Sequence, residues 1–405
     1  MPRENTAATV EDMSTQTEPR TTASGWAATG DLPWARQWDG MNEGPVLLPD
    51  GRVLAAGGGN NRGAVTYADA ALYDPASGQW TVTGSLATSR RLHSLTVLPD
   101  GKVLAAGGFH GHPSTSPNIL TSAEVFDPAT GTWSPTGSMH TARCNHHAIA
   151  LADGRVLVMG GGSERPPIDS LVIAAAEIYD PATGTWTETA PMIHARAAFP
   201  AVLLPDGKVL VAAGLVETGG DLVGLTFCEI YDPVAGTWSP TTPIGTPVPL
   251  EAGRPRVGAQ MVALADGTVL LTGGHTGGPQ NWNYAPFSLG ESERYDPATG
   301  KWTDAAPMRI PRDEFRLIRL DSGKVLAIGG LEYGGYDAGY QNSEIFDPAT
   351  GQWGPLLGLT IGRAKFGAVE LADGRVLIAG GAAVLANAGP DGNHVLITKT
   401  DLFTP

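Results

Sequence analysis

Short apolar runs separated by turn residues recur along the whole chain. In one copy, the run 94–98 is followed by an Asp-Gly turn at 100–101, and the run 102–106 ends at Gly107-Gly108. A third stretch, 124–126 with Val125 and Phe126, leads through an Asp-Pro turn to Trp133. The runs are too short for helices and are bounded by turn residues, and Asp-Gly suits a tight hairpin, so each copy predicts four short antiparallel strands. The second strand is almost entirely apolar, which predicts that both of its faces are covered.

The template returns seven times, at intervals of 50 to 60 residues. The leucine before each Asp-Gly or Ser-Gly turn marks the copies: Leu48, Leu98, Leu151, Leu204, Leu264, Leu320 and Leu371. Six copies reach a tryptophan at their fourth strand: Trp80, Trp133, Trp186, Trp238, Trp302 and Trp353. We expect these tryptophans to be wedges between neighbouring copies rather than ligand-binding residues.

The two ends of the chain complement each other. The last copy stops at 402–405, where the other copies continue to Gly and Trp, and residues 25–30 match the fourth strand at 79–84. The N-terminal strand is therefore predicted to be the outermost strand of the seventh copy, which closes a ring and removes its open edges.

A repeat near fifty residues with a diglycine, a Tyr or Phe and a Trp resembles the kelch repeat. The resemblance covers about residues 26 to 405 and implies an all-β, seven-bladed β-propeller with four antiparallel strands per blade. We expect residues 1–24 to be a disordered arm and residues 25–405 to be a single propeller domain. Kelch propellers include both enzymes and binding scaffolds, so the fold alone leaves the function open.

Composition narrows the class of partner. The net charge of −15 argues against nucleic acid and against an anionic membrane surface. Two cysteines give no disulfide framework, no run of 18 apolar residues is present, and residues 1–24 lack the apolar core of a signal peptide. We expect a cytoplasmic monomer whose partner is a small polar or anionic molecule or another protein.

The loops sort into two ends of the propeller. Turns within the hairpins are short and repetitive, whereas the loops after the diglycine and before each first strand vary, and variable loops usually carry function. We call the variable end the top. Its predicted polar rim comprises Asn42, Glu43, Asn60, Asn61, Arg62, Glu164, Arg165 and Glu217, and the longest loop, 275–292, adds Trp282 and Tyr284. These two aromatics either stack on a sugar or aromatic ligand or merely cover the loop.

An arginine lies eight positions before six of the seven anchor leucines: Arg90, Arg143, Arg196, Arg256, Arg312 and Arg363. The first copy has Gly40 there. With Arg91 beside it, this series predicts either a positive funnel for a carboxylate or phosphate, or a repeat residue that caps backbone carbonyls.

Five histidines lie in top segments of the second and third copies, and they are candidate ligands for a transition metal such as Zn, Fe or Cu. His110, His112 and His147 have no counterpart in the repeat. His93 and His146 occupy a register held by phenylalanine in other copies, which favours packing, although either is a candidate fourth ligand. No His-Glu-x-x-His or Cys-x-x-Cys pattern supports a metal site.

Residues 312–316 depart from the repeat because four of the five are charged, and they lie across the ring from the histidines. Asp313 and Glu314, with Glu332 and Tyr333 on the next top loop, are candidates for general acid–base catalysis. The alternative is that the charges pair with one another and with the adjacent blade.

The scaffold is similar to that of galactose oxidase, a radical-copper kelch enzyme, but the Tyr-His pair of that family is absent from this sequence. Kelch enzymes similar to sialate mutarotase and the iron-using nitrile-specifier proteins stay open. We therefore expect a small-molecule enzyme of isomerase, lyase or cyclase type, in which a metal assists if one binds. The alternatives are a protein-binding scaffold and a carbohydrate-binding propeller.

Overall fold

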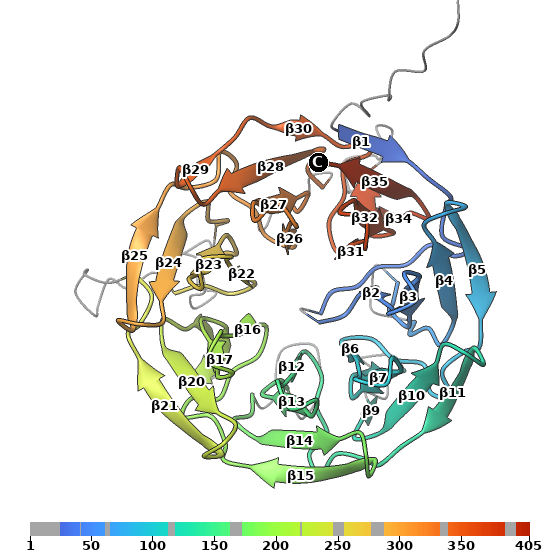
Figure 1. Ribbon diagram of the computed structural model, residues 1–405, viewed down its shortest axis with the longest axis horizontal. Coiled ribbons are helices and arrows are strands. Elements are labelled where there is room, and N and C mark those ends of the chain that lie inside the picture. The colour runs from blue at the N-terminus through green and yellow to red at the C-terminus, as the bar shows by residue number, and fades with distance from the viewer. Residues whose placement is uncertain are drawn as a thin grey trace, which may run out of the picture.

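Seven four-stranded antiparallel sheets stand around a central axis in the computed structural model (Figure 1), which confirms the predicted propeller. The structure describes residues 25–40, 42–60, 65–111, 118–162, 172–218, 221–245, 255–276, 287–332, 339–384 and 394–405. No helix is present in these ranges, and hence none that is long and apolar enough to cross a membrane.

Each blade runs from its innermost to its outermost strand. Blade 1 comprises β2 (Val46–Leu47), β3 (Val53–Ala56), β4 (Ala70–Asp74) and β5 (Gln79–Thr83). Blade 2 comprises β6 (Ser94–Val97), β7 (Val103–Ala106), β10 (Ala123–Asp127) and β11 (Thr132–Pro135). Blade 3 comprises β12 (His147–Ala150), β13 (Val156–Met159), β14 (Ala176–Asp180) and β15 (Thr185–Thr189). Blades 4 and 5 comprise β16 (Ala201–Leu203), β17 (Val209–Val211), β20 (Cys228–Asp232) and β21 (Thr237–Thr241); and β22 (Gln260–Ala263), β23 (Val269–Thr272), β24 (Ser292–Asp296) and β25 (Lys301–Ala305).

Blade 6 comprises β26 (Arg316–Arg319), β27 (Val325–Ile328), β28 (Asn342–Asp347) and β29 (Gln352–Trp353), with β30 (Leu357–Gly358) also paired to β28. Blade 7 comprises β31 (Gly367–Glu370), β32 (Val376–Ala379), β35 (Thr400–Thr404) and β1 (Gly25–Ala28). Three small hairpins follow diglycine positions: β8 (Phe109–His110) with β9 (Asn118–Ile119), β18 (Leu215–Thr218) with β19 (Asp221–Gly224), and β33 (Ala382–Val384) with β34 (His394–Leu396).

The hydrophobic core lies between neighbouring blades. The second strands are buried throughout, as predicted; one cluster joins Leu104 of β7 to Val156 and Trp186 of blade 3. The Trp186 indole N–H donates to the Gly137 carbonyl of the preceding blade at 2.7 Å, and Trp238, Trp302 and Trp353 make the same type of bond. The tryptophans are therefore wedges between blades, as the repeat predicts.

The N-terminal strand closes the ring. β1 pairs antiparallel with β35 over four residue pairs, from Gly25 opposite Thr404 to Ala28 opposite Asp401 (Figure 1). The rings of Trp26 and Phe403 pack at 5.2 Å, and the Trp26 indole donates to Ser343 of blade 6. This confirms the closure inferred from the two termini.

The first blade departs from the repeat by an insertion. The sequence placed Gly40 at the repeat arginine of this copy, but Arg36, four residues earlier, takes that role. Its Nη1 donates to the carbonyls of Gly57 and Asp69, as Arg90 Nη1 donates to those of Gly107 and Ser122 in blade 2. The prediction that blade 1 lacks this arginine is therefore wrong, because counting from Leu48 did not allow for the insertion.

The inserted segment runs to the centre of the ring, where the blue chain before β2 approaches the axis in Figure 1. Asn42 accepts a hydrogen bond from the Ala148 N–H through its Oδ1 and one from the Leu95 N–H through its carbonyl oxygen. Asn42 thus bridges the inner strands of blades 2 and 3 rather than lying on a rim, and it lines the cavity along these strands.

Candidate functional site

A ring of unusual backbone conformations marks the top end of the axis. The second residue after the repeat arginine has a positive φ in six blades: Leu92, Asn145, Ala198, Gly258, Glu314 and Lys365, with φ between 49° and 69°. For an L-residue this conformation costs about 1–2 kcal/mol. Hydrogen bonds from one blade to the next hold it, for example Asn145 N–H to the Leu92 carbonyl at 2.9 Å and Lys365 N–H to the Glu314 carbonyl at 3.3 Å.

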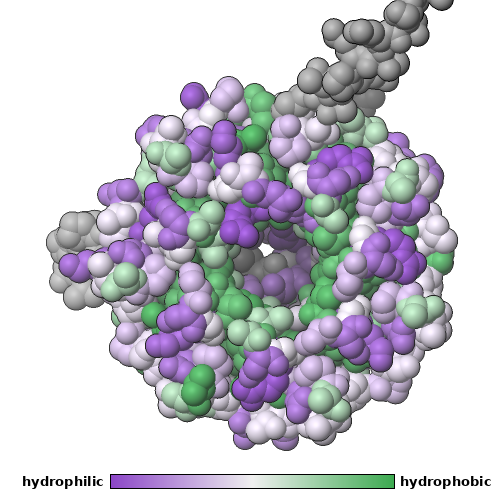
Figure 2. Space-filling model, viewed as in Figure 1, coloured by the Kyte–Doolittle hydropathy of each residue, from purple (hydrophilic) through white to green (hydrophobic). Residues whose placement is uncertain are grey.

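A cavity of about 310 Å³ lies inside this ring. We call it the mouth. It is lined by Asp39, Arg91, Leu92, Asn145, Ala198, Val257, Gly258, Gln260, His275, Asp313, Glu314, Arg316 and Lys365. A second cavity, of about 620 Å³, follows the inner strands of blades 2 to 5, with Arg319 of blade 6 on its wall. Figure 2 shows the opening at the axis, whose wall carries both hydrophilic and hydrophobic residues.

Asp39, contributed by the blade 1 insertion, is the centre of one charged group in the mouth. It pairs with Arg91 of blade 2 and, at 3.3 Å, with Lys365 of blade 7, and it accepts hydrogen bonds from Gln37. Burial alone would raise the pKa of Asp39, but Lys365, Arg91 and Gln37 together hold it below its ordinary value.

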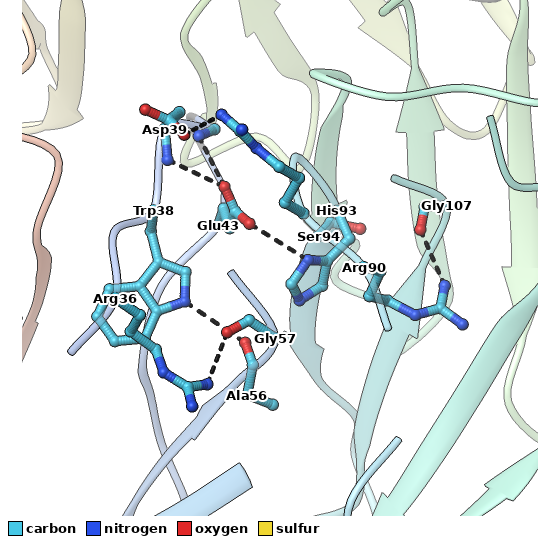
Figure 3. Close-up of polar contacts among 12 residues, drawn as sticks. Arg36, Trp38, Asp39, Glu43, Ala56, Gly57, Arg90, His93, Ser94 and Gly107 are labelled. Carbon is cyan, nitrogen blue, oxygen red and sulfur yellow. Dashed lines mark hydrogen bonds and ion pairs between the residues drawn. The ribbon is translucent and has the colours of Figure 1, made fainter. Parts of the chain in front are cut away.

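Glu43 supports this arrangement from below (Figure 3). Its Oε2 accepts the N–H groups of Asp39 and Gly40 at 3.0 Å, and its Oε1 lies 3.5 Å from His93 Nδ1. Arg316 fixes the same segment from blade 6, because its Nη2 donates to the carbonyls of Trp38, Gly40 and Glu43. The predicted rim residue Glu43 is therefore an internal support of the insertion.

The opposite wall of the mouth holds a His–carboxylate pair. His275 Nδ1 lies 3.1 Å from Asp313 Oδ2, and both side chains are largely buried. Gly258 makes room for this pair, since a Cβ at that position would lie 2.7 Å from Asp313 Oδ1. Glu314 lies beside the pair, with its Oε1 3.6 Å from Lys365 Nζ. Burial raises the pKa of Glu314 above its ordinary value. The positive charge of Lys365 opposes this shift, whereas the neighbouring carboxylates of Asp313 and Asp39 increase it.

The repeat arginines lie inside the blades. Arg90, Arg143, Arg196, Arg256, Arg312 and Arg363 are fully buried, and each pairs with a carboxylate of the third strand at 2.6–3.1 Å: Glu124, Glu177, Glu229, Glu293, Glu344 and Asp401 respectively. Each also donates to backbone carbonyls. The structure thus agrees with the carbonyl-capping interpretation, and of the predicted ligand-binding arginines only Arg91 lines the mouth.

The candidate metal ligands are dispersed. His93 and His146 are buried at the inter-blade position that Phe199, Phe315 and Phe366 fill elsewhere, in agreement with a packing role. His147 is also buried and packs on Phe199. Burial lowers the pKa of His93, His146 and His147, to about 4 for His147.

His110 is exposed, and its Nδ1 contacts Ser89 Oγ at 2.7 Å. Within the described ranges, no three His, Cys, Asp or Glu side chains converge to hold a metal ion. His112 lies outside the described residues.

Several predicted residues lie outside the described ranges: Tyr333, Trp282, Tyr284, Asn61, Arg62, Glu164 and Arg165, and the side chain of Glu217 is likewise not described. Asn60 and Glu332 are described; neither lines the mouth, and Glu332 is exposed. Sequence reasoning found Arg91, Asp313 and Glu314 but missed Asp39, His275 and Lys365. The signal for Lys365 was available, since it occupies the same register as Glu314.

Comparisons with known proteins agree with the repeat and the propeller fold. The kelch motif model matches residues 90–140 and 143–193. Kelch-like protein 35 of Mus musculus is 27% identical over 309 residues, which make up 74% of this chain and 45% of the relative. The chain is a kelch-repeat β-propeller.

Two further relatives are shorter matches. Kelch-like protein terF of Aspergillus terreus is 31% identical over 198 residues, covering 46% of this chain and 39% of the relative. β-Scruin of Limulus polyphemus is 27% identical over 210 residues, covering 51% and 21%. The propeller thus spans less than half the length of these three curated relatives.

Two solved structures resemble the kelch propeller in fold. A copper complex of a fungal alcohol oxidase of the AA5 family superposes with a TM-score of 0.66 at 19% identity, covering 93% of this chain and 76% of the other. YjhT superposes with a TM-score of 0.60 at 14% identity, covering 81% and 99%. At these identities the likeness shows the shared fold alone.

Proposed function

We propose that this kelch propeller is a binding scaffold that holds a segment of a partner protein at its mouth. The supporting observation is a fixed polar surface: residues from all seven blades line a cavity of about 310 Å³, and every blade except blade 4 contributes a polar side chain. Arg91, Lys365 and Arg316 already direct donors to protein carboxylates and carbonyls. Such a preorganised surface recognises shape and charge with little reordering on binding. The cavity is at the small end of the range for ligand pockets, which suits one or two side chains of a partner.

The names of the relatives are consistent with this proposal. Kelch-like protein 35, kelch-like protein terF and β-scruin are not named for a reaction. The likeness to the alcohol oxidase is one of fold and carries no activity to this chain.

Site-specific crosslinking tests the proposal. A photoreactive benzophenone amino acid is placed at Glu332, an exposed top residue, or at Val234, an exposed residue of a bottom turn. When the crosslinker is activated in cells that produce the protein, we expect position 332 to give one crosslinked product of defined mass and position 234 to give none. Filling the mouth by Leu92→Trp should remove the crosslink while leaving the melting temperature within a few degrees. Absence of a crosslink at 332, or an equal pattern at both positions, would contradict the proposal.

One observation favours acid–base enzymology as a second candidate. His275 Nδ1 lies 3.1 Å from Asp313 Oδ2, so an imidazole and a carboxylate, two groups used in general acid–base catalysis, face each other on the wall of the mouth. With Glu314 beside it, this pair could move a proton during isomerisation or elimination of a small polar molecule. Metabolite mixtures incubated with the wild type and with Asp313→Asn, followed by mass spectrometry, test this. A product formed by the wild type and lost in the variant supports catalysis, and identical mixtures contradict it.

A further inference from the structure

The basic side chains of the mouth are all engaged with protein groups, although Arg91 Nε has no hydrogen-bond partner among the described residues. Lys365 Nζ lies between Asp39 Oδ1 and Glu314 Oε1, at 3.3 and 3.6 Å, and Arg91 pairs with Asp39. The carboxylate of Glu314, and to a smaller extent that of Asp39, raises the pKa of Lys365, so this amine stays charged. Arg316 donates to four backbone carbonyls, including that of Phe366 at 2.9 Å. An incoming anion would therefore have to compete with protein groups for each of these cations.

Glu314 is satisfied much less well. Its only recorded ion pair within the described part of the chain is with Lys365, which Asp39 approaches more closely. No hydrogen bond to its carboxylate is recorded there. The side chain lines the mouth and is 31% exposed, and its raised pKa shows that the ionised form is disfavoured by its surroundings.

The backbone holds Glu314 at this place against its own preference. Its φ is 54°, a conformation that costs an L-residue about 1–2 kcal/mol, and the equivalent positions in blades 4 and 5 are Ala198 and Gly258. Six blades share the positive φ, so the strained backbone belongs to the repeat, whereas the weakly paired carboxylate is particular to blade 6. A charge held in this way is a feature that binding sites retain at the expense of stability.

We infer that the mouth receives a cationic side chain of the partner, a lysine or an arginine, whose charge pairs with Glu314. This inference rests on the proposed scaffold function and adds the chemistry of the partner. Asp313 and Asp39 lie near Glu314 and favour a positive over a negative guest, and the net charge of −15 attracts basic segments over longer distances. An acidic side chain would meet the same three carboxylates, while the three cations of the mouth are already engaged with protein groups.

A peptide-display library tests the inference without knowledge of the natural partner. Peptides are selected on the wild-type propeller and then measured on four purified variants: Leu92→Trp, Glu314→Gln, Lys365→Met and Glu188→Gln. Glu188→Gln is the matched control, because it removes the same charge from the exposed outer strand β15. We expect mouth-dependent peptides rich in Lys or Arg. Their affinity should fall by about tenfold or more in Glu314→Gln, the effect of losing a charged hydrogen bond, and stay unchanged in Glu188→Gln.

The outcomes separate the two proposals. Mouth-dependent peptides that are acidic and lose affinity in Lys365→Met would overturn the cationic guest and leave the scaffold function standing. Peptides that bind the wild type and Leu92→Trp equally would count against the scaffold function itself. Melting temperatures of all variants identify any that fail to fold, and a charge-reversed pair, Glu314→Lys with an acidic peptide, tests the contact again if Glu314→Gln is unstable.

A pH series adds an independent readout. Cation binding needs ionised Glu314, whose pKa is raised, so affinity should weaken as pH falls from 7.5 towards 5. Lys365, Arg316, Asp313, Asp39 and His275 face the same cavity and are unchanged in Glu314→Gln, so this variant isolates the contribution of Glu314. Glu314→Gln should therefore retain only a small pH dependence; a wild-type affinity that rises on acidification would contradict the inference.

Discussion

The blades and the mouth use the same residue types in opposite ways. In the blades, each of six buried arginines has its own carboxylate at 2.6–3.1 Å, and the pattern repeats around the ring. In the mouth, Lys365 is shared by Asp39 and Glu314 at 3.3 and 3.6 Å, and the partners come from different blades. The buried pairs that recur in each blade stabilise the architecture. The cluster in the mouth does not recur and is accessible from the cavity, as a recognition site requires.

The largest expected effect is loss of the closed ring on which both regions depend. Deleting residues through Gly30 removes β1, its pairing with β35 and the Trp26–Phe403 contact. We expect the shortened protein to aggregate, as shown by size-exclusion chromatography, because β35 becomes an exposed edge. Deleting only residues 1–24 keeps every described contact of β1 and is the matched control; a soluble, folded product from the longer deletion would show that closure is dispensable.

The next effect distinguishes a closed blade pair from a surface pair. Arg196→Met leaves Glu229 buried without its cation, and breaking such a pair costs about 3–5 kcal/mol. Arg155→Met removes an exposed pair with Asp153, and such pairs contribute about 0–1 kcal/mol. Urea denaturation measures both variants. Similar losses in the two would mean that burial of the repeat arginine does not decide its contribution.

A smaller effect is expected at the mouth. Gly258→Ala introduces a Cβ at φ 69° and places it 2.7 Å from Asp313 Oδ1. We expect a loss of about 1–2 kcal/mol from the left-handed backbone, together with a shift of the His275 ring resonances as Asp313 is displaced. The reverse change, Ala198→Gly, is made at the same register in blade 4 and should change stability by less than about 1 kcal/mol, since relief of strain offsets lost chain rigidity. Unaltered His275 resonances in Gly258→Ala would refute the supporting role of this glycine.

The smallest effect concerns the histidines that follow the repeat. Burial, aided by the charge of Arg143, lowers the pKa of His146, so its contribution to stability is present at neutral pH and is lost as pH falls below about 6.5. His146→Phe restores the residue found in other blades and should reduce this acid sensitivity, by less than about 1 kcal/mol between pH 7.5 and 6. Thermal melts over this range measure it, with His110→Phe, an exposed position, as the control. An unchanged pH profile would indicate that His146 is not protonated on unfolding.

The repeat pattern of the chain is enough to predict the scaffold. The strand pattern, the seven copies, the closure by β1 and the wedge role of the tryptophans all follow from short-range periodicity, because each blade solves the same packing problem with the same residues. The repeated Glu or Asp on the third strand, such as Glu124 and Asp401, was equally readable as the partner of the repeat arginine, since both recur with one period.

The composition of the mouth, in contrast, depends on the closure of the ring. Asp39, Arg91, His275, Glu314 and Lys365 are far apart in sequence and meet because the inner strands of different blades start around one axis. Arg36 could replace the missing repeat arginine only because an insertion was absorbed at the centre of the ring, which a fixed count along the chain does not reveal. Distances between charges on different blades depend on the radius of the closed ring, a quantity that no local pattern encodes.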